Sequence, residues 1–113
     1  MENTVLITKQ VLQPVEALAV QLPFYYVSGI YFKHYTLITA ERNLISFYRN
    51  GASISIDTWQ YSQDDDESLS NRIAKDMESG LYEPIAESVF MHMFSEAHRD
   101  LFYQVNPNLK PTE

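Results

Sequence analysis

Residues 43–56, with the sequence NLISFYRNGASISI, carry the clearest local signal in this 113-residue chain. Within them, Asn50-Gly51 predicts a tight β-hairpin, because Asn followed by Gly best tolerates the two positive φ angles of a type I′ turn. With that turn, Phe47 faces Ile54 across the hairpin. Because side chains alternate along a strand, both strands then agree on one apolar and one polar face. The apolar face would hold Ile45, Phe47, Ile54 and Ile56, and the polar face Ser46, Tyr48, Ser53 and Ser55.

The residues before the hairpin extend the predicted sheet. Phe24–Trp59 is dense in Tyr, Phe, Ile and Thr, which are enriched in strands, and Ile30–Ile38 is predicted to be the preceding strand. Helical patterns follow only after this run of strands. That order favours an α+β fold with an antiparallel meander of three to four strands over parallel βαβ units.

Two connections fit between this strand and the hairpin. One is a three-residue turn at 41–43 with Asn43 left-handed, and the other is a four-residue loop. We favour the three-residue turn, because it places the more apolar side chains on the apolar face. It would bury Tyr35 and Leu37, whereas the longer loop would bury His34 and Thr36.

Two helices are predicted after the sheet. Ser62 and Asp65 have the spacing of a capping box, and the acidic run 64–67 suits the positive end of a helix dipole. Gly80 suits the end of this helix, and Pro84 suits the first turn of a second one. The buried stripe would be Leu69, Ile73 and Met77 in the first helix, and Ala86, Phe90, Met93, Phe94, Ala97 and Leu101 in the second.

The N-terminal segment is predicted to be helical. Pro14–Leu22 has apolar residues at the i, i+3, i+4, i+7 spacing of one buried helix face, with a proline in its first position. Thr4–Leu12 fits a strand or a helix, and we favour the helix. The expected molecule is therefore a single domain over residues 1–113 with a short N-terminal helix, a C-terminal helix packed on the sheet and a flexible tail at 106–113.

Composition excludes several classes of function. The chain has 15 acidic and 8 basic residues, a net charge of −7 and no cysteine. The charge is opposite to that of nucleic-acid binders, and disulfides, thiol nucleophiles and cysteine zinc sites are excluded. The longest uncharged run, Ala17–Phe32, is interrupted by Pro23 and Gly29 and is shorter than the ~20 residues of a spanning helix. With an acidic rather than basic start, the chain is expected to be cytoplasmic, without a membrane or nucleic-acid partner.

Charge and aromatic residues are distributed unequally along the chain. Residues 1–56 contain three acids and four bases, whereas residues 57–113 contain twelve acids and four bases. Ten of the fifteen aromatic residues lie between Phe24 and Tyr61. The sequence therefore predicts a molecule with an acidic helical side and an aromatic sheet side.

Two polar patterns resemble metal sites but fit structural roles better. His92 and Glu96 have an i, i+4 spacing, yet His98 is turned roughly 120° away around the helix, so a third ligand is absent locally. The acidic run at 64–67 fails the EF-hand template, which requires glycine at the position of Leu69 and glutamate at that of Lys75. We predict no catalytic residue, metal or cofactor from these patterns.

The surface aromatic and acidic residues are the remaining candidates for function. A sheet this rich in tyrosine cannot bury every ring, and exposed Tyr and Trp are effective binding groups. Tyrosine is also common in half-solvated strands, so a purely structural role fits the same residues. The candidate binding residues are Tyr25, Tyr31, Tyr48, Trp59, Asp64, Asp65 and Asp66.

Several short stretches resemble one group of proteins. They are LPFYY at 22–26, GIYFK at 29–33, SISI at 53–56 and GLYEPIAE at 80–87. In this order they are similar to small acidic proteins of Bacteroidetes-type bacteria. The pattern is loose, contains no diagnostic motif, and leaves out the N-terminal segment and 60–71. The resemblance implies a bacterial origin and transfers no function and no site residue.

Three functions are compatible with these observations. The first is a non-catalytic protein-binding module that recognises a partner, particularly a basic one, through the acidic and aromatic sides. The second is a binder of small molecules or glycans through surface Tyr and Trp. The third is an enzyme with a carboxylate/histidine site at Glu87, His92 and Glu96. The exposed sheet edge, with Met91 and Phe102, also makes a homo-oligomer a candidate assembly.

Overall fold

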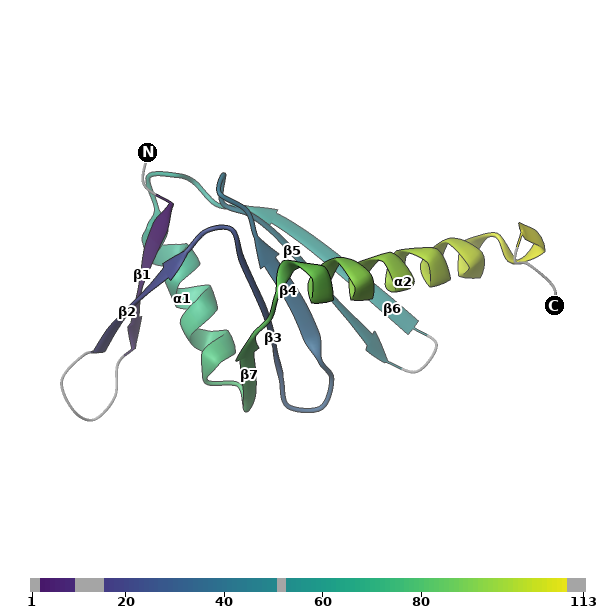
Figure 1. Cartoon of the computed structure of the whole chain (residues 1–113), viewed down its shortest axis with the longest axis horizontal. Helices are drawn as coiled ribbons and strands as arrows, with labels where there is room; N and C mark the ends of the chain where they lie inside the picture. Colours follow the sequence, from purple (N-terminus) through teal and green to yellow (C-terminus); the bar gives the residue numbers. More distant parts are fainter. Residues whose placement is uncertain (1–2, 10–15, 51–52, 110–113) are drawn as a thin grey trace.

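The computed structural model describes residues 3–9, 16–50 and 53–109, and over these residues the fold is α+β (Figure 1). A five-stranded antiparallel sheet is accompanied by a two-stranded sheet and two helices. The strands are β1 (Thr4–Lys9), β2 (Glu16–Gln21), β3 (Phe24–Gly29), β4 (His34–Ile38), β5 (Asn43–Asn50), β6 (Ser53–Gln60) and β7 (Leu81–Pro84). The helices are α1 (Asp66–Met77) and α2 (Glu87–Val105), and a 3₁₀ helix at Pro107–Leu109 follows α2.

The large sheet has the strand order β6-β5-β4-β3-β7. Strands β3 to β6 form the predicted antiparallel meander, so the fold class and the meander are confirmed. After α1, the chain returns to pair β7 antiparallel with β3. Strand β7 was not predicted, and the second helix begins at Glu87 rather than at Pro84, because Pro84 stands in the sheet opposite Tyr26.

The register of the β5–β6 hairpin differs from the prediction by two residues. Asn50 pairs with Ser53, and Phe47 faces Ile56 rather than Ile54. A shift of two leaves every side chain on its predicted face, because the side-chain period of a strand is also two. The pattern of apolar residues is therefore the same in both registers. It determines which residues point to α2 but not which residue each one pairs with. Ile45, Phe47, Ile54 and Ile56 all lie on that face, as predicted.

The turn between β4 and β5 also keeps the predicted faces. Tyr35 stands opposite Phe47 and Leu37 opposite Ile45. The left-handed residue is Arg42, with φ 66°, and not Asn43 as expected. The turn is closed by the Arg42 N–H, which donates to the Thr39 carbonyl at 2.9 Å.

The predicted N-terminal helix is wrong, because β1 and β2 form an antiparallel hairpin. Val5 stands opposite Val20, and both are buried, whereas Leu6 between two buried neighbours is exposed. This is the two-residue period of a strand. The buried face packs against α1, a tertiary contact that no local pattern contains. Pro14, on which part of the helix prediction relied, lies outside the described residues.

The two predicted helices exist, with corrected starts. The N-cap of α1 is Asp65, whose carboxylate accepts from the Ser68 N–H at 3.3 Å, and Ser62 lies before the helix. Helix α2 begins at Glu87 with Ala86 as a cap that makes no side-chain hydrogen bond. The predicted stripes are largely confirmed, since the residues that pack on the sheet or on the hairpin are Leu69, Ile73 and Met77 in α1, and Phe90, Met93, Phe94 and Ala97 in α2.

The sheet separates two hydrophobic clusters, one on each face. The α1 cluster joins the β1–β2 hairpin, α1 and one face of the sheet, and its fully buried residues include Tyr26, Leu44 and Leu69. The α2 cluster lies under α2 and centres on Phe47 and Phe90, whose ring centroids are 5.6 Å apart. The sheet therefore presents Ser, Thr, Leu and Tyr residues to one layer and a phenylalanine-rich surface to the other.

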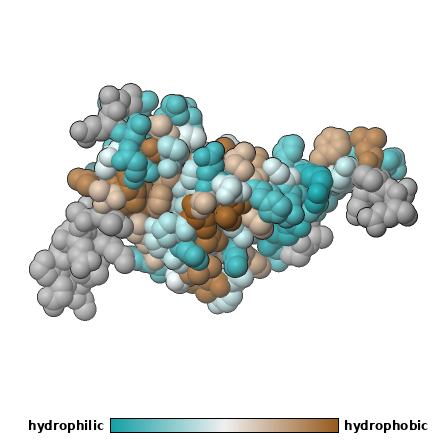
Figure 2. All heavy atoms as spheres, in the orientation of Figure 1, coloured by the Kyte–Doolittle hydropathy of each residue, from teal (hydrophilic) through white to brown (hydrophobic). Residues whose placement is uncertain are grey.

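The molecule is elongated, with extents of 57 × 31 × 21 Å. Helix α2 crosses the sheet and continues past its edge (Figure 1). On the face shown in Figure 2, the surface is hydrophobic near the start of α2 and at its far end, and hydrophilic between these areas. Val105 and Leu109 are exposed at the far end. Within the described residues, neither helix is long and apolar enough to cross a membrane.

Candidate functional site

The structure divides the predicted binding residues among three places. Trp59 and the acidic residues of the α1 start meet at one end of the molecule. Tyr31 and Tyr48 lie near the β3–β4 loop, and Tyr25 lies under α2. The first place brings together four of the predicted residues, Trp59, Asp64, Asp65 and Asp66.

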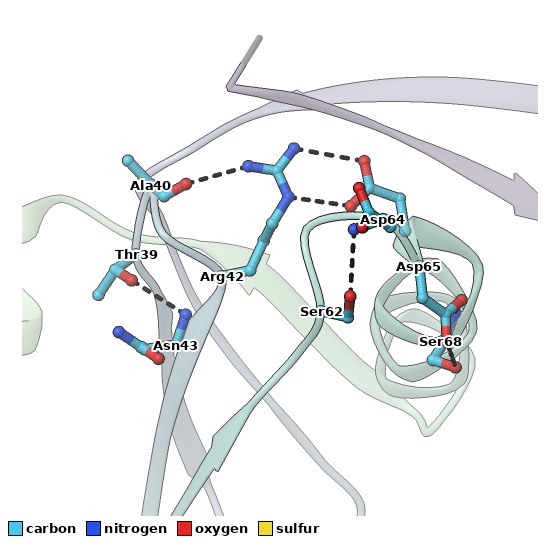
Figure 3. Close-up of polar contacts among 9 residues, drawn as sticks. Thr39, Ala40, Arg42, Asn43, Ser62, Asp64, Asp65 and Ser68 are labelled. Atoms are coloured by element: carbon cyan, nitrogen blue, oxygen red, sulfur yellow. Dashed lines mark hydrogen bonds and ion pairs between the residues drawn. The ribbon is translucent and has the colours of Figure 1, made fainter. Parts of the chain in front are cut away.

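Arg42 organises this end of the molecule (Figure 3). Its side chain is only 4% exposed, and its Nε and Nη2 donate to the two carboxylate oxygens of Asp66 at 2.9 and 3.3 Å. Its Nη1 donates to the Ala40 carbonyl at 3.0 Å. The hydrogen bonds to Asp66 raise the pKa of the Arg42 guanidinium above its ordinary value. The bidentate contact fixes the start of α1 against the β4–β5 turn.

The acidic run before and within α1 therefore has unequal roles. Asp66 is held by Arg42, and Asp65 caps the helix and also accepts from the Ser68 hydroxyl at 2.9 Å. Asp64 is exposed, and its backbone N–H donates to the Ser62 hydroxyl at 3.2 Å. Glu67 is exposed in the first turn of the helix. The carboxylates of Asp64 and Glu67 are thus available to a partner.

Trp59 lies beside this acidic run in a shallow depression, here called the Trp59 concavity. Trp59 is 64% exposed, although it stands opposite the buried Leu44 in the sheet. The concavity has a volume of about 540 Å³. It is lined by Trp59, Gln60, Tyr61, Ser62, Asp65, Ser68 and Asn71.

Charge pairing leaves the surface acidic. All four arginines hold aspartates: Arg42 holds Asp66, Arg72 holds Asp76, and Arg49 and Arg99 both contact Asp100. Among the lysines whose side chains the structure describes, Lys33 and Lys75 form none of these ion pairs. Exposed carboxylates for which no ion pair is found within the same residues are Glu41, Asp57, Asp64, Asp65, Glu67, Glu78, Glu83 and Glu87.

A second depression, the β3–β4 cleft, lies between the β3–β4 loop and the C-terminal half of α1. It has a volume of about 430 Å³. Its wall on the loop side is Ile30, Tyr31 and Phe32, of which Tyr31 is 88% exposed. Its polar lining is Ser28, His34, Arg72, Lys75, Asp76 and Ser79.

A partly buried hydrogen-bond network includes Arg72 and Asp76 of this cleft. The hydroxyl of Tyr26, a fully buried residue, donates to Asp76 Oδ2 at 2.6 Å, and Arg72 Nε donates to the same oxygen at 3.1 Å. Burial, and next the neighbouring Asp76 carboxylate, raise the pKa of the Tyr26 hydroxyl far above its ordinary value. Tyr26 is therefore a permanent donor that links the sheet to α1. Sequence reasoning missed this network, although the i, i+4 spacing of Arg72 and Asp76 is visible in the sequence.

Tyr48 and Tyr25 occupy two further environments. The Tyr48 ring lies between Phe32 and His34, with centroid distances of 5.8 and 4.6 Å. Tyr25 packs on Phe90 at 5.6 Å on the opposite face of the sheet. Burial, with a smaller contribution from Glu87, raises the pKa of the Tyr25 hydroxyl. These two predicted residues therefore do not belong to the Trp59 concavity.

The residues of the enzyme hypothesis lie on the outer surface of α2. His92 Nε2 is 3.3 Å from Glu96 Oε1, but the two side chains are 69% and 42% exposed, and Glu87 is exposed one turn earlier. Within the described residues, no group of three His, Cys, Asp or Glu side chains has a geometry that could hold a metal ion. A water-exposed pair on a convex helix surface does not exclude solvent from a reaction, which argues against the carboxylate/histidine site.

Comparisons with known proteins give no independent guide to this site. No protein-family model, no curated protein and no solved structure matches the chain. The resemblance to acidic bacterial proteins therefore stays an expectation from the sequence.

Proposed function

We propose that this chain is a non-catalytic protein-binding module that holds a basic segment of its partner in the Trp59 concavity. One observation carries the proposal: an exposed tryptophan shares the concavity with Asp65, a carboxylate of the acidic run that forms no ion pair within the described residues. Tryptophan is the aromatic side chain that attracts Lys and Arg most strongly over its face. Asp64 and Glu67 add full charges in the same acidic run as Asp65, which lines the concavity, whereas Asp66 is held by Arg42.

The electrostatics of the whole chain favour the same class of partner. With a net charge of −7, the protein attracts a basic segment over distances near the Debye length, about 8–10 Å at physiological salt. Such attraction raises the association rate and weakens as salt increases. Recognition of a basic partner should therefore depend steeply on ionic strength.

The test is a titration of fluorescein-labelled octapeptides followed by anisotropy, with lysine-rich, glutamate-rich and neutral sequences at 20 and 500 mM NaCl. We expect the lysine-rich peptide to bind at low salt and to lose affinity at high salt. Replacing Trp59 by Leu should weaken binding about 2- to 30-fold, from a cation–π interaction of about 0.5–2 kcal/mol.

A matched control separates the concavity from general acidity. The double substitution Asp64→Asn and Glu67→Gln should weaken binding, whereas Glu83→Gln with Glu87→Gln removes equal charge on β7 and α2 and should change it less than twofold. Equal losses for the two double variants, or equal binding of acidic and basic peptides, would overturn the proposal.

A second candidate function is favoured by the β3–β4 cleft. Arg72, Lys75 and His34 line it beside the exposed Tyr31, so a small organic anion with a flat ring fits its chemistry. Saturation-transfer NMR with benzoate, indole acetate and AMP would detect such a ligand. Lys75→Gln should abolish the signal, and a signal unchanged in that variant would reject the cleft as its site.

A further inference from the structure

Among the strands of the described residues, β6 is an edge of the five-stranded sheet. Its neighbour in the sheet is β5, and the strand order ends with it. It is eight residues long, twice the length of the opposite edge strand β7. Its residues from Asp57 to Gln60 are exposed, and they include Trp59 of the concavity. An edge of this length is a template for a further strand.

The register shows which backbone groups of β6 point away from the sheet. The Tyr61 N–H donates to the Arg42 carbonyl at 3.0 Å, and these residues stand opposite each other one position beyond the Asn43–Gln60 pair. Hydrogen-bonded and non-hydrogen-bonded pairs alternate in an antiparallel ladder. Ser55, Asp57 and Trp59 are therefore bonded to β5, and the outward groups belong to Ile54, Ile56, Thr58 and Gln60.

The side chains of β6 divide in the same alternation. Asp57 and Trp59 lie on the face of the sheet that also carries Ser46 and Leu44, their partners on β5. Ile54 and Ile56 lie on the other face, where they pack against the α2 cluster. A strand added to β6 would thus meet a carboxylate and an indole on one face and an apolar surface on the other.

We infer that the partner segment binds as an extended antiparallel strand added to β6, with basic and apolar residues in alternation. This inference rests on the proposed function, whose partner class it specifies. Basic side chains would stand beside Asp57 and Trp59, since directly opposite residues have Cβ atoms only about 4.5–5.5 Å apart. The intervening apolar side chains would extend the row of Ile54 and Ile56.

A basic strand fits this edge better than a second copy of the same chain. Two copies carry −7 each and repel one another. The exposed Asp57 in the middle of β6 is also the kind of edge charge that opposes self-pairing. The same carboxylate attracts a lysine or arginine on an incoming strand.

The decisive experiment uses backbone N-methylation of an alternating lysine–valine octapeptide. In antiparallel addition, the peptide residues opposite Ile56 and Thr58 donate to β6, and these are the valines. N-methylation of two central valines should weaken binding about tenfold, from two hydrogen bonds of about 0.5–1.5 kcal/mol each. N-methylation of two central lysines should change it less than twofold, because their N–H groups point to solvent.

Variants of the protein give an independent measurement. Thr58→Pro removes one outward N–H and leaves the ladder with β5 intact, so it should weaken binding about threefold, while Thr58→Ala should not. The circular dichroism melt of each variant checks its fold. Equal binding by both N-methylated peptides, or a loss confined to methylated lysines, would overturn the inference. So would a dimer of the wild type that Thr58→Pro converts to a monomer.

The outcome also separates this inference from the proposed function. A block peptide of four lysines followed by four valines can be compared with the alternating peptide. If both bind equally well, and the Asp64/Glu67 double variant binds both more weakly, the recognition of basic segments holds and strand addition fails. If that double variant has no effect on any peptide, the proposed function itself fails.

Discussion

Replacing Tyr26 by Phe tests the contact that links the sheet to α1. The substitution keeps the buried ring and removes only the hydroxyl that donates to Asp76 Oδ2 at 2.6 Å. Asp76 then keeps Arg72 as its donor, while its carboxylate stays partly buried. A hydrogen bond to a charged group contributes about 1.5–3 kcal/mol, so the variant should lose about that much free energy of unfolding.

The loss of free energy of unfolding should be near the upper end of that range, because Tyr26 belongs to a connected hydrogen-bond network. Tyr26 also hydrogen-bonds the Thr36 side chain, which in turn lies 3.2 Å from the Ser46 hydroxyl. Thr36 and Ser46 are buried, so water cannot replace the lost partner. Removing one member of a connected buried network costs more than removing an isolated hydrogen bond.

Urea denaturation followed by circular dichroism at 222 nm measures the effect. The matched control is Tyr31→Phe, the same chemical change at an exposed ring, which should alter the free energy of unfolding by less than about 0.5 kcal/mol. A double-mutant cycle with Asp76→Asn isolates the coupling between the two side chains. A Tyr26→Phe variant as stable as Tyr31→Phe would refute the reasoning.

The same hydroxyl predicts a dependence on alkaline pH. The pKa of Tyr26 is raised in the folded state above its ordinary value of 10.0, by burial first and then by Asp76. A group with a raised folded pKa stabilises the protein fully below the unfolded pKa and loses this contribution as pH rises beyond it. Stability of the wild type should fall above about pH 10, by up to about 1.4 kcal/mol per pH unit from this group. Tyr26→Phe should fall less steeply over the same range.

Three further substitutions test separate parts of the fold by the same urea assay. Asp65→Ala removes the carboxylate that accepts from the Ser68 N–H and should lower the free energy of unfolding by about 0.5–2 kcal/mol. A loss as small as that of the exposed Asp64→Ala variant would show that Asp65 does not cap the helix. Gly29→Ala should lower the melting temperature sharply or prevent folding, because the new Cβ would clash with the Phe32 carbonyl oxygen and the backbone has φ +131°. A melting temperature equal to that of the wild type would contradict this geometry. Phe90→Ala should lower the free energy of unfolding by about 3–5 kcal/mol, because it empties the centre of the α2 cluster, whereas Phe102→Ala at a half-exposed ring should lower it much less. Equal losses would show that Phe90 is not the centre of this cluster.

The sheet and the helices were predictable because each has a strong local pattern. Alternation in the hairpin fixed the face of Phe47 even though the paired residue was displaced by two. The spacing of Leu69 and Ile73 likewise identified the buried side of α1. Such patterns report which side of an element is buried, and they do so without knowledge of the neighbour that covers it.

The N-terminal hairpin was not predictable in this way. In Pro14–Leu22 nearly every residue is apolar, so a helix face and a strand face both fit the same letters. The choice is made by pairing with β1 and by packing of Val5 and Val20 on α1, which lies more than forty residues later in the chain. Strand β7 was missed for a related reason: its four residues are extended because they pair with β3, and no local pattern shows this pairing.

The candidate site was predictable in its residue types but not in its grouping. Trp59 and the acidic run were chosen from composition and exposure, whereas their common position depends on the Arg42–Asp66 contact. Arg42 itself attracted no attention in the sequence, since a left-handed, buried arginine has no local signature. Tyr25 and Tyr48 were chosen as aromatic residues of the sheet, but they do not lie at the site. Tyr25 lies on the face that packs against α2, and Tyr48 packs against Phe32 and His34 near the β3–β4 loop.

The contrast between the two faces of the sheet has a consequence for changes in chain length. A one-residue insertion in β5 ahead of Ser46 would turn Ser46 toward α2 and Phe47 toward α1, which puts a large ring into the α1 layer and a small hydroxyl into the α2 layer. A two-residue insertion would return every side chain to its own layer and displace only the pairing. Length variation inside these strands should therefore survive in steps of two, and an engineer lengthening the hairpin can add residue pairs without redesigning either core.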